Sequence, residues 1–230
     1  MSTPKVWLSG LSVIKLDVTK QSEISDVFAQ AKNAFNGTDV VFNNAGTVSV
    51  REIEGTPDNV ACGMFEILFW RAANVTRDSV KYFRENSPAG GNFLQMSSNF
   101  GLERTPGAGI KALEGLTHAL SKEIHPKWNI KTTFIELGPF RTGMVDGDDP
   151  ESFVLPPHPA RTDNSLPTLQ FRKWMKNATI DGDTKKATQA FYKLTALSEP
   201  PFRLPIHKDA IHYTRRKAQC LIADTDRYEF

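Results

Sequence analysis

Residues 39–46 read Asp-Val-Val-Phe-Asn-Asn-Ala-Gly, a short apolar run followed at once by amide and small side chains. The apolar run is typical of a buried strand. In an open parallel sheet, ligands bind outside the carboxyl ends of the strands. Small residues at that edge let the backbone approach a ligand closely. The stretch therefore predicts a parallel α/β fold in which Asn44, Ala45 and Gly46 lie at a ligand site.

Strands and helices alternate on both sides of this stretch. Upstream, we expect strands at Lys5–Leu8 and Val13–Leu16 and an amphipathic helix over Gln21–Phe35. Downstream, we expect a helix over 58–85, a strand over 92–96, a helix ended by Pro126 and a strand over 130–137. This alternation implies parallel crossovers with helices on both faces of the sheet. About five strands should lie side by side.

The chain beyond Phe140 is less regular. Several prolines, Asp and Gly residues make 143–168 mostly loop, and helices are expected near 169–177, 185–197 and 209–223. An irregular region over 143–200 suits a lid that covers a substrate, and an ordinary surface loop is the equal alternative. We expect a single domain over 1–230.

Composition excludes several classes of protein. The net charge of +2 implies no nucleic-acid partner and no anionic membrane surface. No apolar run approaches the ~20 residues of a membrane helix. Two cysteines make no disulfide framework, and no Cys/His cluster has zinc spacing, so no metal site is expected. A cytoplasmic, mixed α/β domain is the expectation.

Three further motifs fall at the ends of expected strands. Asp17 ends the second strand, where its carboxylate could accept a hydrogen bond from an adenine amino group, or could simply cap the next helix. Ser97 and Ser98 end the strand over 92–96. Residues 138–142, Gly-Pro-Phe-Arg-Thr, close the strand over 130–137. The carboxyl ends of parallel strands meet at one edge, so these motifs should share a site.

These ordered motifs resemble the short-chain dehydrogenase/reductase family. The similarity runs through LDVT, VVFNNAG, the Ser-Ser strand, KALEGL and IELGPFRT, and the late stretch ending in FRLP is similar to fungal members. The resemblance implies a three-layer, doubly wound, Rossmann-like parallel sheet. It also implies an oxidoreductase that uses NADP or NAD on a ketone or secondary alcohol. By the same resemblance, Asp17 contacts adenine, Asn44, Ala45 and Gly46 line the adenosine ribose, and Phe140 and Thr142 hold the nicotinamide amide.

Two parts of the family pattern are missing. A glycine-rich turn and a helix should follow the first strand and bind the pyrophosphate, but only four residues separate Leu8 from Val13. A strand–helix–strand unit takes roughly 30 residues, so the sheet is expected to be truncated at its N-terminal βαβ unit. The family's acid–base Tyr is also absent. Ser98 matches the family Ser, and Lys111 stands thirteen residues later, where the Tyr should be. Counted back from Ala112–Leu116, Lys111 instead resembles the family Lys, with about five residues lost around it, and the Tyr is missing in either alignment. Leu68 stands where the family's helix Asn would be.

Three functions are therefore open. The chain is an NAD(P)-dependent reductase of impaired activity, a catalytically silent relative that keeps its pocket, or a truncated product without function. For the first, the resemblance makes Ser98 and Lys111 the catalytic pair. It also implies a homodimer or homotetramer that pairs through the helices at 58–85 and 109–124.

Overall fold

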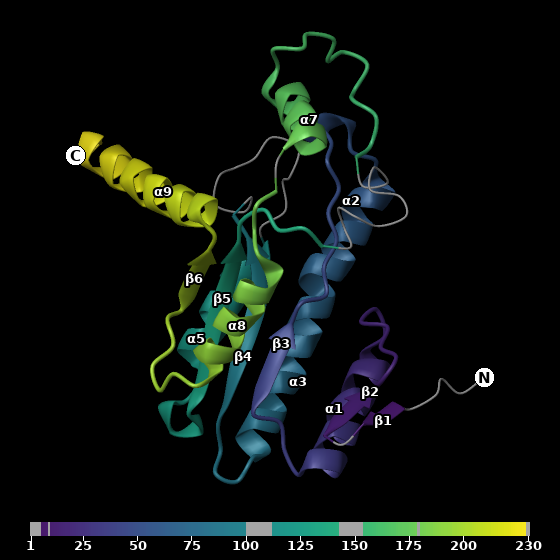
Figure 1. Cartoon of the computed structure of the whole chain (residues 1–230), viewed down its shortest axis with the longest axis vertical. Coiled ribbons are helices and arrows are strands. Elements are labelled where there is room, and N and C mark those ends of the chain that lie inside the picture. Colours follow the sequence, from purple (N-terminus) through teal and green to yellow (C-terminus); the bar gives the residue numbers. More distant parts are fainter. Residues whose placement is uncertain (1–5, 9, 100–111, 143–153, 179, 229–230) are drawn as a thin grey trace.

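A parallel sheet forms the centre of the molecule (Figure 1). The computed structural model describes residues 6–8, 10–99, 112–142, 154–178 and 180–228. Within these residues the sheet has four strands in the order β3–β4–β5–β6. All neighbouring pairs are parallel. The bounds are β3 Val40–Asn43, β4 Gly91–Ser98, β5 Ile130–Leu137 and β6 Arg203–Ile206.

Helices cover both faces of the sheet, which confirms the predicted three-layer α/β architecture. On one face lie α1 (Gln21–Phe35), α3 (Ala72–Glu85) and α5 (Ala112–Glu123), and on the other lies α8 (Thr184–Thr195). The predicted helix over 58–85 is confirmed as a continuous rod, in which a π-helical turn joins α2 to α3. The remaining elements are α2 Asp58–Phe65, the π-helical turn Glu66–Arg71, the 3-10 turns Ile53–Gly55 and Pro126–Trp128, α7 Pro167–Asn177 and α9 Lys208–Arg227.

Two hydrophobic clusters, one on each face, hold these layers together. Successive side chains of a strand point to opposite faces, so Phe93 and Leu94 of β4 enter different clusters. The Phe93 cluster joins α1 and α3 to the sheet, and the Leu94 cluster joins α8. Their buried members are Ile24, Phe28, Val75, Phe83 and Phe93 on one face and Leu94, Ile135 and Leu194 on the other.

The N-terminal strands do not join the sheet, which corrects the expectation of about five parallel strands. β1 (Val6–Leu8) and β2 (Leu11–Val13) form a separate antiparallel hairpin in which Leu8 pairs with Leu11. A parallel connection needs a crossover of a dozen or more residues, whereas a tight turn suffices for an antiparallel pair. Gly10, at φ 86°, provides the left-handed backbone of this turn.

Because the hairpin stays apart, β3 is an edge strand of the described sheet. Val40 and Phe42 on it are 39% and 40% exposed, an unusual state for apolar residues of a parallel sheet.

Among the described residues, no helix is long and apolar enough to cross a membrane. In the same residues, no group of three His, Cys, Asp or Glu side chains is arranged to hold a metal ion.

Candidate functional site at the carboxyl edge of the sheet

The carboxyl ends of β4, β5 and β6 lie level with one another. Ser98 pairs with Leu137, and Leu137 pairs with Ile206. Backbone hydrogen bonds continue one residue beyond the strands: Asn99 N–H donates to the Leu137 carbonyl at 2.9 Å, and Gly138 N–H donates to the Ile206 carbonyl at 3.0 Å. The edge is therefore rigid where two of the predicted motifs, Ser98 and the residues after Leu137, come together.

Ser98 is half-buried at this edge. Its hydroxyl donates to Oδ1 of Asn99 at 3.3 Å, and Asn99 is itself buried. Lys111, the predicted partner of Ser98, lies outside the described residues. α5 begins at the next residue, Ala112. The pairing of Ser98 with Lys111 therefore stays a prediction.

The segment after β5 is held by close backbone packing. Phe140 forms a parallel bridge with Gly182, and its ring meets the His207 ring edge-on with centroids 5.7 Å apart. A Cβ added at Gly182 would lie 2.4 Å from the Pro139 carbonyl oxygen, so only glycine fits there. Phe140 is consequently fixed beside β6, whereas Thr142, the second predicted nicotinamide residue, is exposed.

The residues after β3 are open to solvent. Asn44, Ala45 and Gly46 are all exposed, while Asn43, which precedes them, is buried and donates to Oε1 of Gln95 at 2.9 Å. Leu68, in the position of the family's helix Asn, lies close by: a Cβ at Gly46 would be 3.7 Å from its Cδ2. In a doubly wound sheet the ligand crevice forms where the strand order reverses. The described strands run in sequential order, so they provide one wall of that crevice.

Asp17 orders the turn before α1. Its Oδ1 accepts from the Thr19 hydroxyl at 2.6 Å and from the Thr19 N–H at 2.9 Å. These hydrogen bonds from Thr19, with the nearby charge of Lys20, hold the pKa of Asp17 below its usual range. The carboxylate does not cap α1, whose N-cap residue is Lys20 and which has no side-chain cap, so the capping interpretation is wrong. The contact of Asp17 with adenine stays a prediction.

The described residues do not fit the pyrophosphate of a dinucleotide. Such a group binds at the free N–H groups of a helix N-terminus that follows the first strand. Here β1 turns directly into β2, since Leu8 pairs with Leu11. The next helix, α1, begins beside two carboxylates, because Glu23 accepts from the Asp17 N–H at 2.8 Å. Negative charge at that terminus opposes a phosphate.

Two buried carboxylates and a partly exposed arginine form an ion network beneath the edge that was not predicted from the sequence. Arg203 of β6 bonds to Glu136 of β5, which is fully buried, and its two terminal nitrogens reach Oε2 of Glu114 at 3.1 Å. Oε1 of Glu114 accepts from the Ser97 hydroxyl at 2.9 Å. The network ties α5 to β4, β5 and β6. A signal was present, because Glu136 interrupts an otherwise apolar strand end and a buried carboxylate needs a cation.

A second missed group surrounds His207, directly after β6. Its side chain is 8% exposed, and Nε2 lies 2.9 Å from Oδ1 of Asp181. Nδ1 accepts from the Asp209 N–H at 3.3 Å, which assigns the Nε2 proton to the Asp181 bond. Lys208 and His207, by their hydrogen bonds, lower the pKa of Asp181 to about 2. His207 has φ 96°, a backbone that glycine adopts far more readily.

Residues 154–177 are fastened to the segment that follows the Asn44–Gly46 motif. Val50 bridges Val154, and the buried Arg172 of α7 lies 3.6 Å from the buried carboxylate of Glu52. Arg172 also donates to the carbonyls of Leu155 at 2.5 Å and Val50 at 3.3 Å. These contacts hold α7 beyond the carboxyl edge of the sheet, near the start of α2 (Figure 1).

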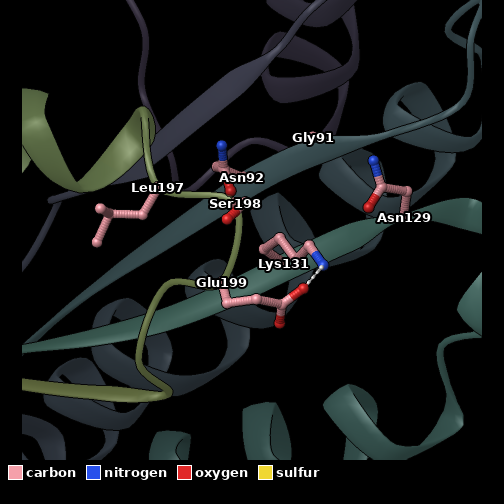
Figure 2. Close-up of a pocket in the computed structure, with 7 residues that line it drawn as sticks. All are labelled: Gly91, Asn92, Asn129, Lys131, Leu197, Ser198 and Glu199. Atoms are coloured by element: carbon pink, nitrogen blue, oxygen red, sulfur yellow. Dashed lines mark hydrogen bonds and ion pairs between the residues drawn. The ribbon is translucent and has the colours of Figure 1, made fainter.

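A cavity of about 340 Å³ lies at the opposite edge of the sheet (Figure 2). Gly91 and Asn92 at the start of β4 line it, together with Lys131, whose ammonium lies 3.4 Å from the Glu199 carboxylate. This is the amino end of the strands, away from Ser98 and Phe140. Since ligands of open parallel sheets bind at the carboxyl end, the cavity is not the candidate site.

Comparison with known proteins agrees with the motifs. Residues 9–152 match the sequence model of the short chain dehydrogenase family. An uncharacterized oxidoreductase of Schizosaccharomyces pombe is 30% identical over 218 residues, covering 92% of this chain and 72% of the relative. Oxidoreductase calM of Penicillium decumbens is 26% identical over 226 residues, covering 93% and 73%.

Comparison with solved structures also indicates similarity to short-chain dehydrogenases. A short-chain dehydrogenase from Streptomyces avermitilis superposes with a TM-score of 0.79 at 26% identity, covering 95% of this chain and 78% of the other. The sequence match, the relatives and the parallel sheet with its Ser98 and Phe140 edge all agree. The chain therefore belongs to the short-chain dehydrogenase/reductase family of oxidoreductases.

Proposed function

We propose that this chain is a short-chain oxidoreductase whose redox activity, toward a ketone or secondary alcohol with NADP or NAD, is strongly impaired. The observation that carries the proposal is the pairing of Leu8 with Leu11. A pyrophosphate site needs a strand–loop–helix unit at this point, and Ser9 and Gly10 cannot form one. The adenosine and pyrophosphate half of the cofactor then loses its main contacts, and binding is weak.

The other half of the site supports residual chemistry. In this proposal Ser98 polarises the substrate carbonyl, and Phe140 and Thr142 hold the nicotinamide amide. Lys111 delivers the proton in place of the absent Tyr. A Lys amine has an ordinary pKa of ~10.4, so it is a slow acid near neutral pH.

The remaining cofactor contacts are weaker in the same proposal. Asn44, Ala45 and Gly46 are all exposed, so the ribose of the adenosine would rest against a single wall. Asp17 would have to leave its bonds with Thr19 to reach adenine. Both points lower the expected affinity for NADP and NAD alike.

A second candidate function is a catalytically silent family member that still binds a small carbonyl or alcohol. The ion network of Arg203, Glu114 and Glu136 favours it, because this network holds the carboxyl edge together without any contribution from a cofactor. In both functions we propose that residues 154–177, fastened through Glu52 and Arg172, act as a lid over the substrate. A cytoplasmic location, and pairing through the helices at 58–85 and 109–124, complete the proposal.

Fluorescence titration with NADPH and NADH, alongside turnover on simple ketones, tests this proposal. We expect no saturation at low micromolar cofactor and slow or absent turnover. Ordinary reductase rates that persist in Ser98→Ala would contradict it. A cooperative thermal unfolding transition of the same sample would separate a silent folded protein from a truncated product without a stable fold.

A further inference from the structure

The C-terminal helix α9 projects away from the sheet (Figure 1). It runs from Lys208 to Arg227, and Ala210 in its first turn is fully buried. From Ala218 to the end of the helix every residue is exposed. A helical segment without tertiary packing is marginally stable in water. The outer half of α9 therefore gains stability if a further surface packs on it.

One stripe of α9 has the spacing of a helix-pairing seam. Leu221 on the stripe is 51% exposed, Ile211 at its inner end is 38% exposed, and Ile222, directly beside the stripe, is 60% exposed. The stripe repeats at alternating intervals of three and four residues, the pattern by which two helices pack side by side. Its members within the helix are Ile211, Thr214, Ala218, Leu221 and Thr225.

Charge is segregated along the same helix. Arg215, Arg216 and Lys217 lie in its middle, and Asp224 and Asp226 lie near its end, before the final residue Arg227. A parallel copy of the helix would set like charges against each other. An antiparallel copy sets the basic stretch of one helix against the acidic stretch of the other, which is attractive in both halves of a two-fold pair.

One antiparallel alignment of two α9 helices satisfies both the seam spacing and the charge pattern. Placing Ala218 against Leu221 of a second copy also places Thr214 against Thr225, and Ile211 against the residue that follows the helix, Tyr228. The same alignment brings Lys217, beside the seam, next to Asp224 of the second copy, and two-fold symmetry repeats the pair. It also lays the Arg215 side chain along Ile222. The two sheet domains then lie at opposite ends of the paired helices, about 30 Å of helix apart.

We propose that α9 is a homodimer interface, in which the helix pairs antiparallel with α9 of a second copy of this chain. This interface is separate from the helices at 58–85 and 109–124, by which family members are expected to pair. The contact uses surface residues of α9, of which Thr214 and Lys217 are half-buried and the others exposed, so it requires no rearrangement of the sheet. Its short seam, with two Thr and one Ala, makes it a weak dimer at the small end of interface sizes.

Sedimentation velocity of the full chain at rising concentration tests the proposal through charge reversal. Lys217→Glu and Asp224→Lys should each weaken dimerisation by about tenfold, since each turns both symmetric attractions into repulsions. The double variant Lys217→Glu/Asp224→Lys should dimerise like the wild type. Leu221→Glu should abolish the dimer. Arg216→Glu, a matched reversal on the outer side of the same helix, should leave the dissociation constant within about twofold.

Several results would overturn the proposal. A wild-type chain that stays monomeric at hundreds of micromolar shows that α9 does not self-pair. A dimer that survives both Leu221→Glu and Lys217→Glu uses another surface. If the double variant fails to recover dimerisation while its circular dichroism matches that of the wild type, the proposed antiparallel pairing of Lys217 with Asp224 is wrong.

Discussion

The carboxyl edge of β4–β6 keeps the parallel arrangement expected of the family, whereas the N-terminal hairpin β1–β2 departs from it. At the edge, Ser98, Leu137 and Ile206 stay in register across three strands, and Phe140 is fixed against Gly182. In the hairpin, a first strand that should lead into a phosphate-binding helix turns back at Gly10 instead. The difference shows that chain length between strands decides topology, because apolar strands separated by a few residues can pair only antiparallel.

The consequences of the hairpin reach the site itself. With β1 elsewhere, β3 is an edge strand, and the motif after it, Asn44–Gly46, is exposed. The edge that carries Ser98 and Phe140 keeps its packing, and the segment after β3 lacks a neighbouring strand among the described residues.

The largest expected effect concerns stability. Phe93→Ala removes a side chain that is 2% exposed at the centre of the sheet, and should lower the free energy of unfolding by about 3–5 kcal/mol. Val13→Ala, on the 55% exposed hairpin residue, should change it by less than about 0.5 kcal/mol. Urea denaturation measures the free energy of unfolding of both variants. Equal losses would mean that the hairpin is part of the folding core.

Gly182→Ala should damage the carboxyl edge directly. Its Cβ would lie 2.4 Å from the Pro139 carbonyl oxygen and 2.6 Å from Cδ1 of Phe140, at a cost of about 1–3 kcal/mol in unfolding free energy. Gly63→Ala is the control, because nothing lies within 4 Å of a Cβ there. Alanine is the better helix former, so that variant should gain up to about 1 kcal/mol. A harmless Gly182→Ala would show that Phe140 is not held as described.

His207 separates backbone strain from side-chain bonding. Both His207→Gly and His207→Ala lose the contacts to Asp181 and to the start of α9. Only glycine accepts φ 96° without a Cβ penalty. The glycine variant should therefore be more stable than the alanine variant by about 1 kcal/mol, measured by thermal and urea unfolding. The reverse order would place His207 outside the left-handed region.

The smallest effect is a pH dependence at Asp181. Its pKa falls from 3.8 to about 2 in the folded protein, so its ion pair with Lys208 and its hydrogen bond with His207 stabilise the fold fully above about pH 4. That contribution is lost as the pH falls through about 2. Asp181→Asn should be less stable than the wild type at about pH 5, and the gap should close near pH 2. Asp226→Asn, on the exposed end of α9, should follow the wild type throughout.

Sequence periodicity predicted most of the fold because apolar spacing records burial directly. α1 and β5 have the predicted bounds, 21–35 and 130–137, and Ile24 and Phe28 are buried as expected. Phe65, an apolar residue of the helix predicted at 58–85, is 42% exposed, because the spacing of apolar residues does not show which neighbours a helix packs against. β6 was not predicted from the sequence. It has only four residues, two of which, Arg203 and Pro205, are not typical of a strand, and its partner β5 is far away in sequence.

The candidate site was predictable to the same degree. Motifs at strand ends gave Ser98 and Phe140, because the parallel topology brings such ends together. The pairing of Glu136 with Arg203 and of His207 with Asp181 depends on β6, so it could not be predicted before that strand was known. Asp17 allowed two interpretations from sequence, since a carboxylate before a helix can cap it or bind a ligand.

Calorimetric titration of NADPH beside reduced nicotinamide mononucleotide measures the contrast between the two regions most directly. The mononucleotide lacks the adenosine half, which the hairpin region would have to bind. If that half has no phosphate site, the two ligands should bind weakly and within about threefold of each other, a difference of under 1 kcal/mol. Low-micromolar NADPH binding, many times tighter than that of the mononucleotide, would contradict the account and require a phosphate site elsewhere in the chain.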